Sequence, residues 1–165
     1  MKTNRRDMTP ETALNRAAAL CARSEQAASD VRGKLLRWGL TPQQAQEVID
    51  RLIDGGYLDD ERYARAFVHD KFRFNGWGRL KIAHQLQAKG IDRAIIDEAL
   101  TRIDEAEYRE TLQRLLQARA QSTGNKEPQQ ARAALLRFAA SRGFEPQEFF
   151  PAVDHILNDM GYEQD

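Results

Sequence analysis

Three four-residue stretches share a glycine and decide the fold of this chain: Arg37-Trp38-Gly39-Leu40, Ala88-Lys89-Gly90-Ile91 and Ser141-Arg142-Gly143-Phe144. The glycines lie 51 and 53 residues apart. Apolar residues recur eight positions before each glycine and one, ten and thirteen positions after it: Val31, Ile82 and Leu135; Leu40, Ile91 and Phe144; Ile49, Leu100 and Val153; Leu52, Ile103 and Ile156. These matched columns predict a unit that is repeated three times.

Each of the three glycines is predicted to end a helix. A glycine just past a helix adopts the left-handed conformation without a Cβ penalty, and the apolar residue that follows packs back on the last turn. The next helix begins at once. After Gly39, the stretch Thr41-Pro42-Gln43-Gln44 has a capping hydroxyl, a proline at the first helical position and a glutamine at the third.

Helical periodicity runs through nearly the whole chain, and strand-like alternation is absent. The sequence therefore predicts an all-α fold of about nine helices, at residues 9–22, 25–37, 42–54, 59–73, 76–89, 92–103, 104–122, 127–141 and 145–160. They divide into three tandem three-helix repeats at residues 1–56, 57–103 and 104–165. Because a unit of about 50 residues is small for an isolated core, we expect the repeats to stack into an elongated or curved molecule.

The charge balance is uneven along a chain whose net charge is zero, with 25 basic and 25 acidic residues. Residues 62–93 carry 8 Lys or Arg against 2 Asp or Glu, whereas residues 94–165 carry 8 against 13. The basic middle third is a candidate surface for an acidic partner. The alternative is that it complements acidic neighbours within the same fold.

Several classes of protein are disfavoured by what the sequence lacks. No apolar run approaches the roughly 20 residues of a membrane span, and the single cysteine, Cys21, allows no intramolecular disulfide. We expect a cytoplasmic protein. The three histidines show no metal-binding spacing and no phosphate-binding loop is present, so we expect no catalytic residue, metal or cofactor. The run Asp59-Asp60-Glu61 is interpreted as a helix N-terminus rather than a metal site.

The helix predicted at 59–73 and the one after it offer candidate binding residues. We predict a buried face on the first of them, formed by Tyr63, Ala66, Phe67 and Phe74. Trp77 is expected to face outward beside Lys81, as interface anchors do. The alternative, which the sequence favours slightly, is that it packs against the neighbouring repeat. Guanidinium groups in a stripe bind carboxylates or phosphates. The predicted contact residues are Arg62, Arg65, Arg73, Trp77, Lys81 and Lys89.

Three sequence blocks resemble a known family. Gly56-Tyr57-Leu58-Asp59-Asp60-Glu61-Arg62-Tyr63-Ala64 resembles the G-Y-L-D-D-x-R-F/Y-A stretch of the bacterial RecX regulators. The segment 76–91, from Gly76-Trp77-Gly78 to Lys89-Gly90-Ile91, is similar to their G-x-x-x-I-x-x-E-L-x-x-K-G-I block, with Gln85 in place of the usual Glu. An upstream match begins at Ala22-Arg23-Ser24-Glu25-Gln26, where Ala27-Ala28 replaces the usual Glu-Leu.

The resemblance implies tandem three-helix repeats and a regulatory role. Members of the family bind the RecA recombinase filament on single-stranded DNA, lie in its groove and usually inhibit its activity in homologous recombination and the SOS response; direct DNA contact is also attributed to them. We expect a monomer. We interpret Tyr57-Leu58-Asp59-Asp60 as structural, with Tyr57 and Leu58 packing at the repeat junction and Asp59 capping a helix. The alternatives are a stand-alone nucleic-acid-binding protein and a structural adaptor.

Overall fold

The computed structural model describes residues 8–122 and 126–161 of the 165-residue chain. This part of the chain forms nine α-helices and no strand, which confirms the all-α prediction. The helices are α1 (Pro10–Arg23), α2 (Ala28–Arg37), α3 (Pro42–Asp54), α4 (Asp60–Arg73), α5 (Arg79–Ala88), α6 (Arg93–Leu100), α7 (Glu105–Ser122), α8 (Pro128–Ser141) and α9 (Pro146–Asp159). None of the described helices is long and apolar enough to cross a membrane.

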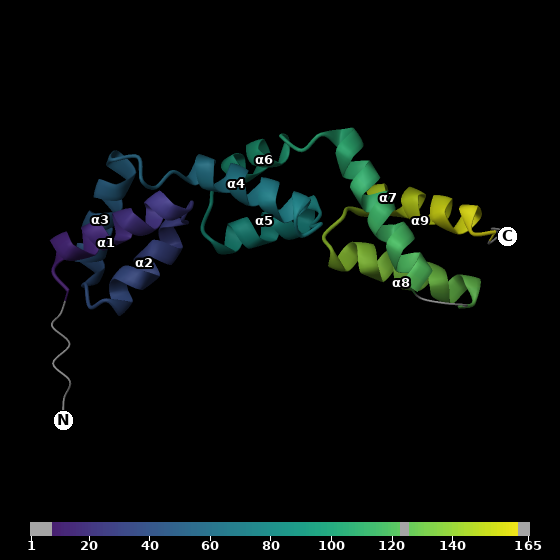
Figure 1. Ribbon diagram of the computed structural model, residues 1–165, viewed down its shortest axis with the longest axis horizontal. Coiled ribbons are helices and arrows are strands. Elements are labelled where there is room, and N and C mark those ends of the chain that lie inside the picture. The colour runs from purple at the N-terminus through teal and green to yellow at the C-terminus, as the bar shows by residue number, and fades with distance from the viewer. Residues whose placement is uncertain (1–7, 123–125, 162–165) are drawn as a thin grey trace, which may run out of the picture.

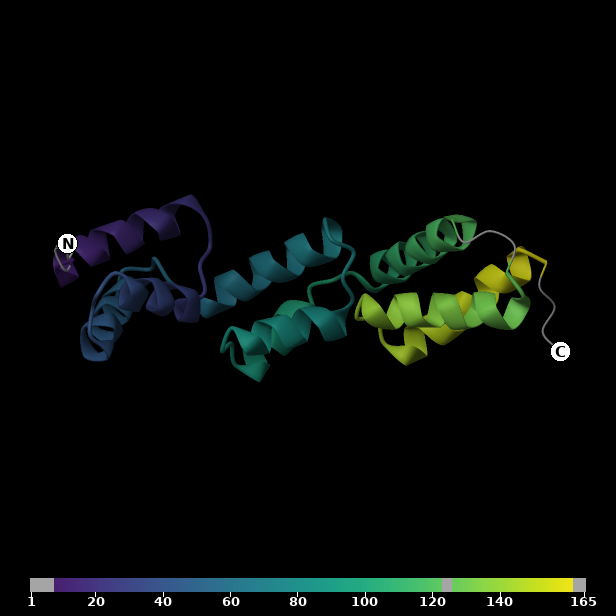
Figure 2. The ribbon, with the colours of Figure 1, turned by 90° about the horizontal axis from the view of Figure 1, so that it is seen from below.

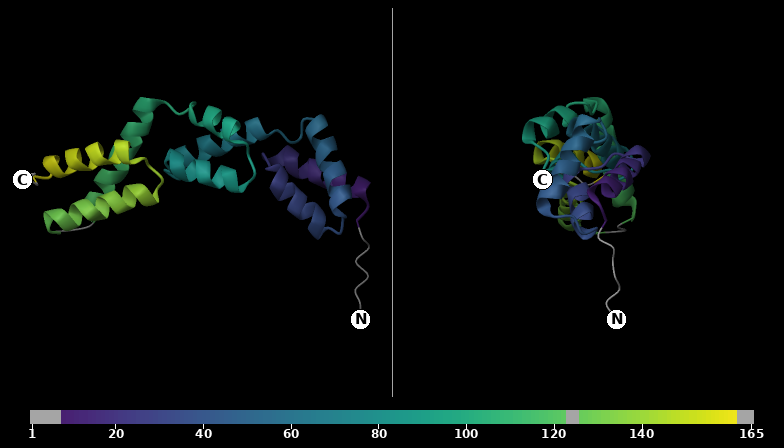
Figure 3. Two further views of the ribbon diagram at one scale, coloured as in Figure 1. Left: turned by 180° about the vertical axis from the view of Figure 1, so that it is seen from behind. Right: turned by 90° about the vertical axis from the view of Figure 1, so that its left-hand side faces the viewer.

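The helices are arranged as three triples in a row. Figure 1 shows α1–α3, α4–α6 and α7–α9 following one another along the long axis, with the first and last triples at opposite ends of the row. We call these triples the first, second and third repeats. Each helix packs most closely against the other two of its own triple. Figure 2 shows the same row from below, and the right-hand view in Figure 3 shows its narrow cross-section end-on, as expected of an elongated repeat protein.

The recurring glycines end the second helix of each repeat in the same way. After α2, the Gly39 N–H donates to the Leu36 carbonyl at 3.1 Å and the Leu40 N–H donates to the Leu35 carbonyl at 3.2 Å. This pair of bonds is the Schellman motif, and it recurs after α5 and α8. The glycines that form it have positive φ values: Gly39 98°, Gly90 78° and Gly143 89°. All twelve apolar residues of the recurring columns are buried.

The buried face of α4 differs from the predicted one. The prediction that Phe74 lies inside is wrong, because this side chain follows the last helical residue and is 78% exposed. Tyr63, Ala66 and Phe67 are partly buried. The fully buried side chains follow a single row at i, i+4 and i+8, formed by Ala64, Val68 and Phe72. The helical period, not side-chain size, therefore selects the inner face.

Apart from Ala27, the buried apolar residues of the described chain form two separate clusters. One extends from Ala13 to Leu58 and belongs to the first repeat. The other extends from Ala64 to Leu157 and is shared by the second and third repeats. Where the second and third repeats meet, the Tyr108 ring lies between two other aromatic rings. Its centroid is 5.7 Å from that of Phe72 and 5.1 Å from that of Phe144. The second and third repeats thus share one core, whereas the first has its own.

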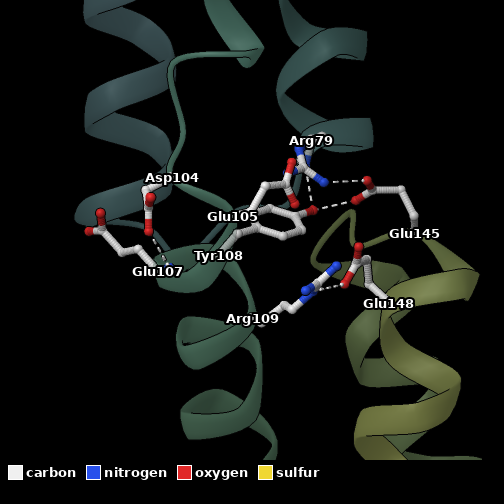
Figure 4. A network of polar contacts seen from close by, with 8 residues as sticks. All are labelled: Arg79, Asp104, Glu105, Glu107, Tyr108, Arg109, Glu145 and Glu148. Atoms are coloured by element: carbon white, nitrogen blue, oxygen red, sulfur yellow. Dashed lines mark hydrogen bonds and ion pairs between the residues drawn. The ribbon is translucent and has the colours of Figure 1, made fainter.

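A polar network reinforces the junction between the second and third repeats (Figure 4). Arg79, at the start of α5, pairs with Glu105 at 2.7 Å and with Glu145 at 2.9 Å. Its backbone N–H donates to the Tyr108 hydroxyl at 3.0 Å, and that hydroxyl donates to Glu145. Burial, with the hydrogen bond to Glu145, raises the pKa of Tyr108 well above its ordinary value. The phenol therefore stays protonated and able to donate.

The turn after α8 lies directly against the first turn of α5. The Gly78 N–H donates to the Arg142 carbonyl at 2.7 Å, and the Leu80 N–H donates to the Gly143 carbonyl at 2.9 Å. Two N–H groups at the start of α5, which have no partner within the helix, are satisfied in this way. The approach leaves no room for side chains, because a Cβ on Gly143 would lie 2.3 Å from the Lys81 Cβ.

Alanine substitutions at Gly143 and Gly90 separate the cost of this approach from the cost of the backbone conformation. Both residues have positive φ, but a Cβ on Gly90 would meet nothing within 4 Å. Gly90→Ala is expected to lower the free energy of unfolding by about 1–2 kcal/mol, the cost of a left-handed non-glycine residue. Gly143→Ala is expected to cost about 1–3 kcal/mol more. Urea denaturation measures both, and equal losses would contradict the close approach.

Candidate partner-binding surface

Trp77 lies in the turn between α4 and α5 and folds back over α4. The backbone N–H of Trp77 donates to the Lys71 carbonyl at 3.0 Å, and Gly76 before it has a φ of 66°. The indole is partly buried against the shared core, with the Phe67 ring edge-on to it at a centroid distance of 6.3 Å. Trp77 therefore packs on its own repeat and keeps part of its surface open to solvent.

Two lysines extend their ammonium groups over the indole ring of Trp77. The Lys71 Nζ, from α4, lies 4.9 Å from the ring centroid, and the Lys81 Nζ, from α5, lies 4.5 Å from it. The negative face of the indole attracts such cations by about 0.5–1 kcal/mol each at exposed sites. We call Lys71, Trp77 and Lys81 the Trp77 cluster. The indole ring of Trp77 thus brings the two ammonium groups close together at one place on the surface.

The Trp77 cluster carries the uncompensated charge of the second repeat. Residues 57–103 contain nine Lys or Arg side chains, and seven of them have a carboxylate within 4.0 Å. The two that have no such partner in the described part of the chain are Lys71 and Lys81. The acidic neighbours that the sequence left as an alternative thus neutralise most of the basic middle third, and the remaining charge gathers at Trp77.

Arg62, one of the predicted contact residues, connects the first and second repeats. Its Nε bonds to Glu25, which precedes α2, and its Nη2 donates to the Gly56 carbonyl at 3.0 Å and the Tyr57 carbonyl at 3.3 Å. The hydrogen bond to Glu25 raises the pKa of the Arg62 guanidinium. The hydrogen-bonding groups of the Arg62 side chain are therefore used within the chain, in contacts with Glu25 and with the Gly56 and Tyr57 carbonyls.

Lys89 makes a second connection between the same two repeats. Its Nζ lies 2.8 Å from both carboxylate oxygens of Asp30 on α2, and the Ser29 hydroxyl donates to the Lys89 carbonyl at 2.8 Å. The hydrogen bond to Asp30 raises the pKa of Lys89. Because the buried apolar clusters do not join here, polar contacts provide much of the attachment of the first repeat.

The other two predicted contact residues are also paired. Arg73 lies 3.2 Å from Glu107 on α7, at the junction with the third repeat. Arg65 pairs with Glu61 one turn earlier on α4 at 3.3 Å, and its side chain remains exposed. The structure therefore brings together Trp77 and Lys81 of the predicted set and adds Lys71, which the sequence analysis missed.

The residues of the predicted structural motif Tyr57-Leu58-Asp59-Asp60 do not all have the environment that was predicted for them. Asp59 is the N-cap of α4 and accepts from the Arg62 N–H at 3.1 Å. Leu58 is 2% exposed and belongs to the core of the first repeat. The prediction that Tyr57 packs at the junction is wrong, because its side chain is 45% exposed and lies beside Gly55. Among the described residues, no group of three His, Cys, Asp or Glu side chains is placed to hold a metal ion.

Comparisons with known proteins identify the family. A model of the first three-helix domain of RecX matches residues 13–52, and a model of its second three-helix domain matches residues 59–100. The regulatory protein RecX of Xanthomonas axonopodis pv. citri is 35% identical over 150 residues, which is 90% of each chain. The chain belongs to the RecX family.

Further RecX relatives match more than nine-tenths of the chain. The regulatory protein RecX of Prosthecochloris aestuarii is 30% identical over 151 residues, which cover 92% of this chain and 97% of the relative. The crystal structure of RecX from Lactobacillus salivarius matches 93% of this chain and 97% of its own, with a TM-score of 0.77 at 20% identity. At that identity the match shows a shared fold, including the third repeat, which neither domain model covers.

Neutral substitutions of the acidic partners test the polar junction between the first two repeats. A Glu25→Gln/Asp30→Asn variant removes the two carboxylates that hold Arg62 and Lys89. Its distance distribution from small-angle X-ray scattering is expected to broaden, while its unfolding free energy changes little, since ion pairs that are open to solvent contribute little to stability.

The matched control for this junction is Glu61→Gln/Asp97→Asn, which removes two pairs that lie within single helices. It is expected to scatter like the unmodified chain. Scattering curves that do not distinguish the two variants would contradict an electrostatic attachment of the first repeat.

Proposed function

We propose that this chain binds the RecA recombinase filament on single-stranded DNA and lowers its activity without a catalytic step of its own. The partner follows from membership of the RecX family. The observation that supports the contact site is the Trp77 cluster, where two lysines without carboxylate partners flank a partly exposed indole. We further propose a cytoplasmic monomer that requires no metal or cofactor.

The elongated row of repeats suits a partner built from identical subunits. Three triples lie end to end along one axis, so the chain contacts more than one place on a filament at the same time (Figure 1). Linked contacts reinforce one another because the second binding event is intramolecular. A chain that bridges neighbouring subunits hinders their movement and the addition of further subunits, which gives inhibition without chemistry.

Within the proposed surface, the predicted contact residues have different roles. Trp77, Lys81 and Lys71 form the direct contact, since a tryptophan flanked by cations is a typical interface anchor. Arg65 lies on exposed surface nearby on α4. Arg62, Lys89 and Arg73 act indirectly by holding the repeats in position, since each bonds to a carboxylate of a neighbouring repeat.

The proposal is tested with DNA-dependent ATP hydrolysis by the cognate recombinase. Increasing concentrations of the chain are expected to lower the hydrolysis rate. A Lys71→Glu/Lys81→Glu variant is expected to need at least about tenfold more protein for half-maximal inhibition, because reversed charges repel the surface that the lysines attract.

The control is Arg93→Glu/Arg102→Glu, which makes the same change in net charge at two pairs on and beside α6. It is expected to inhibit like the unmodified chain. Unchanged ATP hydrolysis at excess protein would contradict the proposed function. Equal inhibition by both variants would instead show that the Trp77 cluster is not the contact site, and would leave the proposed function standing. Tight binding to DNA in the absence of recombinase would favour a stand-alone nucleic-acid-binding protein.

A further inference from the structure

The second helices of the three repeats lie along one edge of the molecule. In Figure 1, α2, α5 and α8 follow one another along the lower edge, with α3, α6 and α9 above them. The view from behind in Figure 3 shows the same three helices at the lower edge. Equivalent helices of the three repeats thus lie along the same edge of the row.

Charge is segregated according to the position of a helix within its repeat. The helices α2, α5 and α8 contain seven Lys or Arg residues and one acidic residue, Asp30. The helices α3, α6 and α9 contain two Arg residues against eight Asp or Glu residues. A chain of zero net charge therefore has a basic edge on its second helices and an acidic side on its third helices.

Most of the charge on the second helices is free of carboxylate partners. Arg79 and Arg132 are paired with acidic side chains, and Asp30 is neutralised by Lys89. No carboxylate of the described chain lies within salt-bridge distance of the remaining five cations. They are distributed over all three repeats and comprise Arg32, Lys34, Arg37, Lys81 and Arg137.

We propose that this basic edge is a docking surface for an acidic protein surface, which contacts all three repeats at once. The proposal rests on the function proposed above and extends it, since it adds α2 and α8 to a contact that was centred on the Trp77 cluster. These five cations have no carboxylate partner, although Arg32 donates to the Gln46 side chain on α3 and Lys81 lies over Trp77. Their charges are complementary to carboxylates on the partner.

Apolar side chains on the same helices indicate protein rather than nucleic acid. Leu36 on α2 is 42% exposed and Leu80 on α5 is 53% exposed. A charged phosphate backbone gains nothing from contact with these leucines, whereas apolar contacts are ordinary in protein interfaces. Moreover, no Phe, Tyr or Trp of these three helices is exposed in the described structure. Base stacking, which supports binding to single strands, has no open platform there, since Phe138 on α8 is partly buried and lies beneath Arg119 and Arg142.

The two lysines over Trp77 support the same conclusion. Both ammonium groups lie above the indole ring, so a nucleobase would have to displace a cation in order to stack on it. The acidic side made by the third helices also repels a polyanion, and zero net charge removes the long-range attraction that basic domains exert on nucleic acids.

One charge reversal in each second helix tests whether the edge acts as one surface. Arg37→Glu, Lys81→Glu and Arg137→Glu are each expected to raise the concentration for half-maximal inhibition of the recombinase on the order of threefold. The triple variant should show about the product of the three effects, because distant sites act independently. Arg51→Glu on α3 and Arg93→Glu on α6 are the matched controls and should have no effect. Changes confined to Lys81→Glu would overturn the proposal and leave the proposed function standing.

A Leu36→Ser/Leu80→Ser variant tests the nature of the partner without altering charge. Weaker inhibition by a variant whose circular dichroism is unchanged is the expected result. Undiminished inhibition would overturn the assignment to a protein surface. Oligo(dT) that binds the chain more tightly than poly-L-glutamate of equal charge, at the same ionic strength, would also overturn it.

A titration that does not use the recombinase keeps the proposal independent of the proposed function. Poly-L-glutamate added to the full chain is expected to shift backbone amide NMR signals on α2, α5 and α8 and to leave α3, α6 and α9 unchanged. Shifts spread equally over both sides would contradict the basic edge. If the recombinase is not inhibited at all, the proposed function fails, while this titration still decides whether the edge binds carboxylates.

Discussion

The contact between the turn at Gly143 and the start of α5 is the constraint on which the second half of the molecule depends. Two backbone hydrogen bonds at 2.7 and 2.9 Å satisfy the first N–H groups of α5, and two glycines leave the space that they require. The same approach positions Glu145 beside Arg79, and Phe144 against Tyr108. The six helices α4–α9 therefore share one core, and Trp77 of the Trp77 cluster packs against it.

The attachment of the first repeat has a different physical character. Its apolar core is separate, and Arg62 and Lys89 connect it to the second repeat through carboxylates that are only partly shielded from solvent. Such pairs weaken as salt increases. The molecule thus combines a firmly packed body, α4–α9, with a module attached by polar contacts. That combination suits adjustment to the proposed filament partner, since the two apolar cores are separate.

Much of the fold could be predicted because helix ends and the helical period are local. Gly39 and its two counterparts specify where second helices stop, and the residues at fixed offsets from them are all buried. The inner face of α4 was mispredicted because large aromatic residues were given priority over the i, i+4 row. Trp77 and Lys81 were recognised from sequence, but Lys71 was missed because the turn at Gly76 brings the indole back over α4. Pairs such as Lys89–Asp30, separated by 59 residues, have no local signal.

The central claim, that α4–α9 form one body to which the first repeat is attached by polar contacts, is tested most directly by native-state hydrogen exchange. Buried amides of α4–α9 are predicted to exchange through a common opening with one free energy and one dependence on denaturant. Amides of α1–α3 are predicted to open separately, with their own free energy. Opening of α7–α9 apart from α4–α6, or a single transition that includes all nine described helices, would contradict the account.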